Sequence, residues 1–237
     1  MKALETVINN YLGNSTYFAI VMSLAYYMLG TVLKRKFKLA IFNPLIVASL
    51  LTIATIVIFR IDMEVYNSAG SYISFLLTAA TVCYGMLLYE ELNVLKTYFK
   101  AIIIGILVGI AVTMVTILGL SILFRLPHEQ YVSLLPKNVT TAIGLDVSSA
   151  NGGIPSITIV WILLTGNLGN AIAEPVIRTF KIDEPVARGV AIGSSSHAIG
   201  TAKALEIGEV EGAISGLSLA VTGLISVVVA AIFAQLY

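Results

Sequence analysis

Residues 140–166 read TTAIGLDVSSANGGIPSITIVWILLTG, and residues 197–223 read HAIGTAKALEIGEVEGAISGLSLAVTG. Both stretches open with polar residues and Ala-Ile-Gly, pass through a polar or glycine-rich segment, and continue through apolar residues to Thr-Gly. Backbone groups without hydrogen-bond partners are costly in lipid, so polar, glycine-bearing segments of membrane proteins line cavities instead. Two such segments in corresponding positions indicate a transporter substrate site. We therefore interpret the two stretches as an internal repeat.

The composition of the chain indicates a membrane protein. Of its 237 residues, 58% are hydrophobic and only 11% are charged, and the mean hydropathy is +0.95. Soluble domains carry about 25% charged residues. The net charge of +1 indicates no nucleic-acid partner. One cysteine, Cys83, and two histidines provide neither an internal disulfide nor metal-ligand spacing, so we expect no metal and no cofactor.

Apolar runs predict an all-α polytopic fold. A membrane span needs about 20 apolar residues. We predict six full spans, at 17–33, 43–59, 72–89, 99–124, 153–173 and 211–236. Within the fourth run, Gly105 and Gly109 form a small-xxx-small pattern, which is typical of close helix packing.

Two further segments, 131–150 and 186–205, are less apolar and rich in Ser, Thr and Gly. Each either crosses the membrane fully, which gives eight spans, or re-enters and returns. Basic residues prefer the cytoplasmic side of the membrane, so the basic cluster at 34–38 places the first loop inside. The basic residues between 178 and 188 then also lie inside only if the segment 131–150 re-enters and does not cross. Re-entrance makes the two copies an inverted repeat whose tips meet near the midplane, as alternating access requires.

These patterns predict two regions. Residues 1–128 form an N-terminal scaffold of four helices, preceded by an amphipathic or simply solvated start in which Leu4, Val7, Ile8 and Tyr11 share a helical spacing. The run 17–33 ends in basic residues, so we expect a retained span and not a cleaved signal. Residues 129–237 form the C-terminal transport region with two half-helix-plus-span repeats.

Three ionisable residues lie in the polar segments: Asp146, His197 and Lys203. Ionisable groups at membrane depth mark substrate or ion pathways by default. Lys203 and His197 are candidates to hold a carboxylate. Asp146 is a candidate to carry a coupled proton or to pair with Lys203, and His197 is a second proton carrier because it titrates near neutral pH. The alternatives are a Lys203 that snorkels and pairs with Glu206, and a His197 that only packs.

Hydroxyls and backbone groups complete the predicted substrate site. We expect contributions from Thr140, Thr141, Ser195, Ser196, Gly200, Thr201 and Asn151. Backbone N–H groups at half-helix ends also favour anions. Asn151 with the two glycines that follow it forms either a tight turn or a flexible gate.

Other charged residues have simpler interpretations. Glu206, Glu209 and Glu211 are expected to form a solvated face at the start of the last helix, where acidic residues suit the positive helix end. Lys137 follows Pro136 and is interpreted as an interfacial anchor. His197 follows a run of serines, but neighbours on one helix do not face each other, so no catalytic dyad and no enzyme is expected.

Four ordered motifs resemble the LrgB/CidB family, which is described as antiholin-like or murein-hydrolase-regulating. They are SLLPKNVTT at 133–141, GGIPS at 152–156, SHAIGTAKAL at 196–205 and GEVEG at 208–212. The resemblance implies a multi-pass protein of the bacterial cytoplasmic membrane that works with a small LrgA/CidA-like membrane protein. It also implies kinship to plastid glycolate/glycerate translocators and to bacterial proteins linked to pyruvate transport.

We therefore expect a carrier of small monocarboxylates that uses alternating access with proton or sodium coupling. We also expect a homo-oligomer, namely a dimer, because symmetric carriers often form dimers. The alternative is a holin/antiholin-like pore or a regulator of murein hydrolases and lysis. A carrier accounts for paired polar repeats better than a pore does, because a pore needs no anion site.

Overall fold

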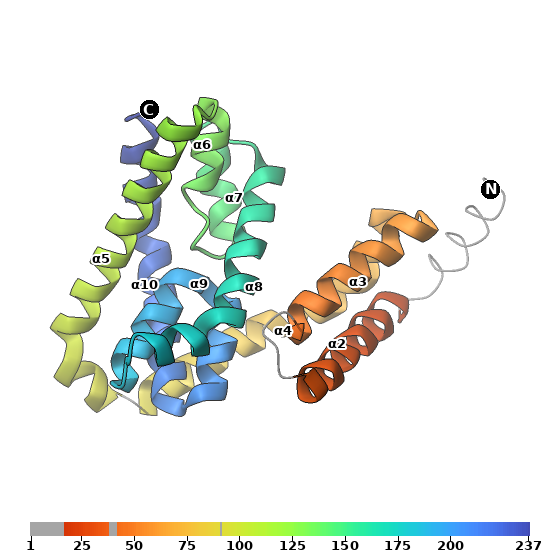
Figure 1. The fold of residues 1–237 in the computed structure, drawn as a ribbon, viewed down its shortest axis with the longest axis horizontal. Helices are drawn as coiled ribbons and strands as arrows, with labels where there is room; N and C mark the ends of the chain where they lie inside the picture. Colours follow the sequence, from red (N-terminus) through yellow and green to blue (C-terminus); the bar gives the residue numbers. More distant parts are fainter. Residues whose placement is uncertain (1–16, 38–41, 91) are drawn as a thin grey trace. The chain divides into compact units, whose positions relative to one another are not determined.

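A computed structural model describes residues 17–37, 42–90 and 92–237 (Figure 1). These residues form helices and connecting turns, with no strand among them. The predicted amphipathic start, with Leu4 to Tyr11, lies outside the described residues. The chain divides into two compact units, Met1–Cys83 and Tyr84–Tyr237.

Each of the six predicted apolar runs lies almost entirely within one helix. The helices are α2 (Phe18–Phe37), α3 (Pro44–Phe59), α4 (Met63–Glu90), α5 (Leu92–Phe124), α6 (His128–Leu134), α7 (Thr141–Ala150), α8 (Pro155–Thr179), α9 (Pro185–Ile207) and α10 (Glu209–Ala234). Among the described residues, α2, α5, α8 and α10 are long and apolar enough to cross a membrane, and α3 is apolar but has 16 residues. The chain is thus an all-helical membrane protein, and the choice between six and eight spans stays a prediction.

The first unit is organised around the packing of α2 against α3. Gly30 of α2 lets the helices approach closely, because a Cβ there would lie 2.7 Å from the Pro44 Cα. Tyr26 and Thr55 share a hydrogen bond of 2.6 Å between their hydroxyls. Pro44 opens α3 as expected, since its missing N–H would be unpaired at a helix start anyway.

The second unit is built on α5, the longest described helix. Its buried residues repeat at nearly every fourth position and pack on α6, α9 and α10: Ile102, Ile106, Ile110, Met114 and Ile117. The pair Gly105 and Gly109 faces α9, as its spacing predicted for a close helix contact, with Val190 and Ser194 against it. Packing therefore groups α5 with the C-terminal helices, whereas the functional boundary predicted at 128/129 remains a prediction.

The chain turns back on itself between α6 and α7, and we name this pair with its connection hairpin 1 (residues 128–150). Both helices of hairpin 1 contact one hydroxyl group of α8, that of Thr158. Its Oγ1 donates to the carbonyl of Ser133 on α6 at 3.0 Å and contacts the Oγ of Ser148 on α7 at 2.7 Å. The tip of hairpin 1 is the segment 135–140. Asn151 and Gly152 (φ 82°) then form a tight turn into α8.

A second reversal divides α9, and we name α9 as a whole hairpin 2 (residues 185–207). His197 has φ 42° and ψ −146°, far from helical values. The chain folds back there: a Cβ on Gly200 would lie 3.1 Å from Ile192 Cγ2, whereas eight residues of straight helix span about 12 Å. The tip of hairpin 2 is therefore at Ser196 and His197.

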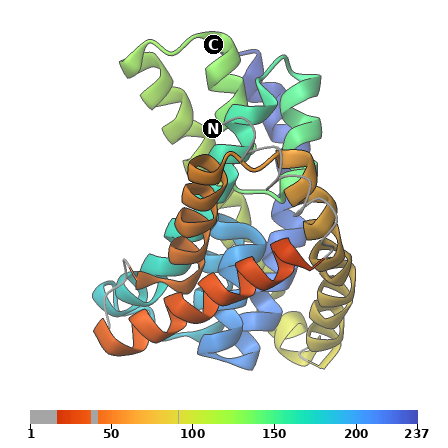
Figure 2. The same ribbon diagram turned by 90° about the vertical axis from the view of Figure 1, so that its right-hand side faces the viewer.

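The two hairpins enter the second unit from opposite ends. Hairpin 1 precedes the start of α8 and hairpin 2 follows its end, and α8 is a helix of 25 residues, about 37 Å long. Both views place α6 and α7 at one end of this unit and α9 at the other (Figures 1 and 2). Gly166 of α8 packs on Ile199, because a Cβ added to this glycine would lie 3.0 Å from the Ile199 Cβ. Gly223 of α10 packs in the same way on Ile143, where an added Cβ would lie 3.2 Å from the Ile143 Cδ1.

Candidate functional site

The tips of the two hairpins are joined by one buried amide side chain. Asn138, 6% exposed, donates from Nδ2 to Thr113 Oγ1 of α5 at 3.0 Å and to the Ser194 carbonyl of hairpin 2 at 3.3 Å. Its Oδ1 accepts from the Lys137 ammonium at 3.0 Å. Buried amides are costly unless they are paired, so these contacts fix the tip of hairpin 1 against both neighbouring elements.

His197 lies at the tip of hairpin 2 and is buried. Its Nε2 lies 2.9 Å from the Ile162 carbonyl of α8, and since a carbonyl only accepts, Nε2 carries the proton. The ring also packs on Gly166, where a Cβ would lie 2.6 Å from it. Thr201 bonds the His197 carbonyl at 3.1 Å and the Ser215 hydroxyl at 2.9 Å. The imidazole therefore packs and positions the break, as the simpler interpretation of His197 expected.

Lys203 lies six residues beyond the tip of hairpin 2, and its side chain is only 8% exposed. Its ammonium forms ion pairs with Glu174 of α8 at 2.5 Å and with Glu206 at 2.9 Å. The pairing with Glu206 was one of the two interpretations of the sequence. Two carboxylates thus already neutralise the cation that the sequence favoured as the substrate ligand.

Two predictions about acidic residues are wrong. Asp146 does not pair with Lys203, whose partners are Glu174 and Glu206, because Asp146 lies on the exposed side of α7. Glu211 is buried and not on a solvated face, because Arg188 Nη1 from the start of hairpin 2 pairs with it at 3.3 Å. Glu206 and Glu209 are exposed as expected.

The remaining predicted residues fall into accessible and covered groups. Thr141 and Ser195 are exposed, and Thr140 and Asn151 are half-buried. Asn151 lies at the far end of α7, where its Nδ2 donates to the Val147 carbonyl at 2.7 Å. Ser196, Gly200 and Thr201 are covered. Only the accessible group can meet a ligand without a rearrangement of hairpin 2.

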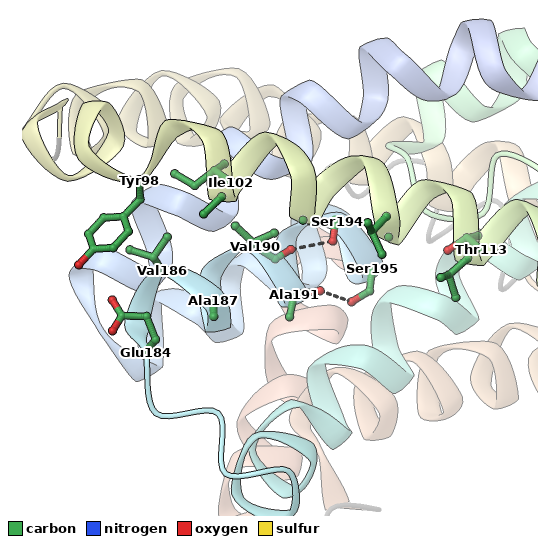
Figure 3. Close-up of a pocket in the computed structure, with 15 residues that line it drawn as sticks. Tyr98, Ile102, Thr113, Glu184, Val186, Ala187, Val190, Ala191, Ser194 and Ser195 are labelled. Carbon is green, nitrogen blue, oxygen red and sulfur yellow. Dashed lines mark hydrogen bonds between the residues drawn. The ribbon is translucent and has the colours of Figure 1, made fainter.

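A groove of about 570 Å³ runs between α5 and the first half of hairpin 2 (Figure 3). Tyr98 and Glu184 lie at one end and Thr113 at the other, with Ser194 and Ser195 nearby. Both serine hydroxyls donate to the carbonyl four residues earlier, at 2.7 Å. The walls are mostly apolar, and near the Thr113 end Asn138 bonds Thr113 and the Ser194 carbonyl. Such a volume with few polar groups is typical of small-molecule sites.

Sequence reasoning missed the residues that join the hairpins. Thr113 gives no signal, because it is a single polar residue in a long apolar run. Asn138 and Lys137 do lie in a polar segment, just before Thr140 and Thr141, but the sequence indicated only an interfacial anchor for Lys137 and no role for Asn138. In the described residues, no group of three or more His, Cys, Asp or Glu side chains could hold a metal ion.

Comparisons with known proteins agree with the resemblance seen in the motifs. The LrgB-like family matches residues 23–236. The antiholin-like protein LrgB of Bacillus mycoides (strain KBAB4) is 36% identical over 218 residues, which are 92% of this chain and 95% of the relative. The proteins of the same name from Bacillus cereus (strain B4264) and Bacillus anthracis (strain CDC 684 / NRRL 3495) are 35% identical over the same shares. No solved structure matches significantly. This chain belongs to the LrgB-like family.

Proposed function

We propose that this protein carries small monocarboxylates, of the size of pyruvate or glycolate, across the bacterial cytoplasmic membrane by alternating access. The observation that carries the proposal is the meeting of two hairpin tips from opposite ends of the second unit, linked through Asn138 and the Ser194 carbonyl. Irregular backbone at membrane depth is tolerated where it is buried in protein or lines a cavity. Broken helices that meet in this way are the usual construction of a carrier's binding site.

Reciprocal contacts support an inverted repeat. Ile143 and Ile199 occupy the same place in the two Ala-Ile-Gly motifs, and Gly166 and Gly223 occupy the same place in the two Thr-Gly motifs. Each glycine packs on the isoleucine of the other copy. Two structurally equivalent halves that contact each other symmetrically can exchange conformations, which is the basis of alternating access.

The accessible polar groups suit a carboxylate. Thr140 and Thr141 offer hydroxyl donors, and the first turn of α7 offers backbone N–H groups. Asp146 is the proposed proton carrier. A small LrgA/CidA-like membrane protein and a second copy of this chain are the proposed partners.

A second candidate function is an antiholin-like role, as a pore or as a regulator of murein hydrolases and lysis. The name of the relatives, antiholin-like protein LrgB, supports this function more directly than it supports transport. The two functions differ in a measurable way, because a carrier saturates with substrate and a pore passes unrelated solutes.

Uptake into proteoliposomes tests the proposal. Vesicles with the purified protein, alone and with its small partner, receive radiolabelled pyruvate or glycolate while a trapped dye reports leakage. We expect saturable uptake, competition between the two acids, and retention of the dye. Asn138→Leu should abolish uptake, because it removes the link between the tips, whereas Asn93→Leu, at an exposed position on α5, should leave it unchanged. Dye leakage that is the same in wild type and Asn138→Leu would overturn the carrier function and favour the pore.

A further inference from the structure

We propose that Lys137, at the tip of hairpin 1, is the cation that binds the carboxylate of the substrate. This inference rests on the proposed function and deepens it, because it names the charged ligand of the same site. The sequence alone favoured Lys203 for this role and assigned Lys137 to an interfacial anchor.

The pairing of charges singles out Lys137. From residue 128 to residue 237, all of which the structure describes, Arg178, Arg188 and Lys203 each form an ion pair with at least one carboxylate. Lys181 has no ion pair there and is exposed, so water solvates it. Lys137 has no ion pair there either, yet it is half-buried. A partly desolvated ammonium without a counter-ion is unfavourable, and a bound anion would relieve that cost.

The surroundings of Lys137 hold its ammonium in place without neutralising it. The contact from its Nζ is to the amide oxygen of Asn138, at 3.0 Å, and this oxygen carries no net charge. Asn138 is itself held by Thr113 and Ser194. The cation therefore lies one residue from the junction of the two hairpins, where a substrate must pass if they alternate.

Donors on the next turn extend the same site. Thr140 begins α7 without a capping hydrogen bond from its side chain, and Thr141 is exposed. A carboxylate on the Lys137 ammonium can accept from these hydroxyls. One cation predicts a preference for acids with one carboxylate over those with two, and little affinity for neutral analogues.

The role of Lys137 is tested by variants that change its charge but keep its hydrogen bond to Asn138. Lys137→Gln keeps an N–H donor for Asn138 but removes the charge, and Lys137→Arg keeps both. We expect Lys137→Gln to raise the KM for pyruvate by about tenfold or more, since a hydrogen bond to a charged group contributes about 1.5–3 kcal/mol. Lys137→Arg should stay within about threefold of wild type. Lys100→Gln, at an exposed position on α5, is the matched control and should not change the KM.

Binding is measured separately from transport. Sodium pyruvate should raise the Tm of the purified wild-type protein in detergent relative to sodium chloride at equal ionic strength, because ligands that bind only the folded state stabilise it. The shift should be lost in Lys137→Gln and kept in Lys100→Gln. The Tm without pyruvate shows whether each variant is folded.

A single-cysteine variant covers the case in which Lys137→Gln does not fold. The chain has one cysteine, so Cys83→Ser with Lys137→Cys carries one thiol at the tip of hairpin 1. Aminoethyl methanethiosulfonate restores a positive charge there and should restore uptake, whereas neutral methyl methanethiosulfonate should not.

The outcomes separate the two proposals. Absence of saturable uptake and of any Tm shift in the wild type overturns the proposed function. A wild type that transports pyruvate, together with a Lys137→Gln variant of unchanged KM or a neutral reagent that restores uptake as well as the cationic one, overturns only the role of Lys137.

Discussion

Hairpin 1 and hairpin 2 reverse the chain by different means. Hairpin 1 uses the six-residue segment 135–140, and 10 of its 23 residues are buried, most of them in α6 and the tip, while its helix α7 buries only Gly144, Val147 and Ser148. Hairpin 2 reverses at His197 alone and buries 12 of its 23 residues, including a lysine. The two hairpins are thus buried to a similar extent overall, but hairpin 1 keeps one face of α7 open. In the proposed carrier, a ligand would therefore reach the site by the open face of α7, while hairpin 2 packs on α8 and α10.

Glycine substitutions should give the largest contrast between the hairpins. A Cβ on Gly193 of hairpin 2 would meet the backbone of Ser215 at 2.8 Å, whereas one on Gly144 of hairpin 1 would meet the flexible end of Ile162. Backbone cannot yield as a side chain does, so Gly193→Ala should destabilise the protein by about 3 kcal/mol and Gly144→Ala by about 1 kcal/mol. Thermal unfolding in detergent measures both. Gly119→Ala, which has open space around it, is the control, and equal losses for Gly193 and Gly144 would remove the contrast.

Removal of both carboxylates from Lys203 should destabilise hairpin 2 almost as much. Glu174→Gln with Glu206→Gln leaves a buried ammonium without a counter-ion, which costs about 3 kcal/mol. Each single variant should cost less, because the other carboxylate remains. Hydrogen exchange should report opening of residues 198–207 in the double variant, with hairpin 1 unaffected. If the stability losses of the two single variants add up to that of the double variant, the two carboxylates do not stabilise the Lys203 ammonium jointly.

Backbone strain at the tip of hairpin 2 predicts a smaller effect. A φ of 42° with a ψ of −146° is unfavourable for any residue with a Cβ, by about 1–3 kcal/mol. Both His197→Gly and His197→Ala lose the bond to Ile162, but only glycine relieves the strain. His197→Gly should therefore unfold at a higher temperature than His197→Ala. The reverse order would mean that the reversal at His197 is not strained.

The smallest effect on stability is expected at Asp146 on the open face of α7. Asp146→Asn should change the free energy of unfolding by less than about 0.5 kcal/mol, as exposed positions usually do. If Asp146 carries the coupled proton, the variant should nevertheless lose stimulation of uptake by a pH gradient. Ser149→Ala, also exposed on α7, is the control. Unchanged stimulation in Asp146→Asn would assign the proton to another group.

The sequence alone was sufficient for features that depend on neighbouring residues. Apolar runs predicted the helices, because each span must be apolar along its own length in lipid. The segments 131–150 and 186–205, which are rich in Ser, Thr and Gly, correspond closely to hairpins 1 and 2, and the ordered motifs identified the family. Gly105 and Gly109 correctly predicted a close helix contact, because close packing of helices needs small residues whatever the partner is.

Only the tertiary structure decided which charges are already paired. Lys203 and Glu174 are 29 residues apart, and Arg188 and Glu211 are 23 apart, so no local pattern shows that they meet. The same holds for Asn138, whose partners Thr113 and Ser194 come from two other helices. The charge of a residue is set by its own type, but its availability to a ligand is set by neighbours that the fold brings from elsewhere in the chain. For that reason, Lys137 and not Lys203 became the candidate for the substrate carboxylate.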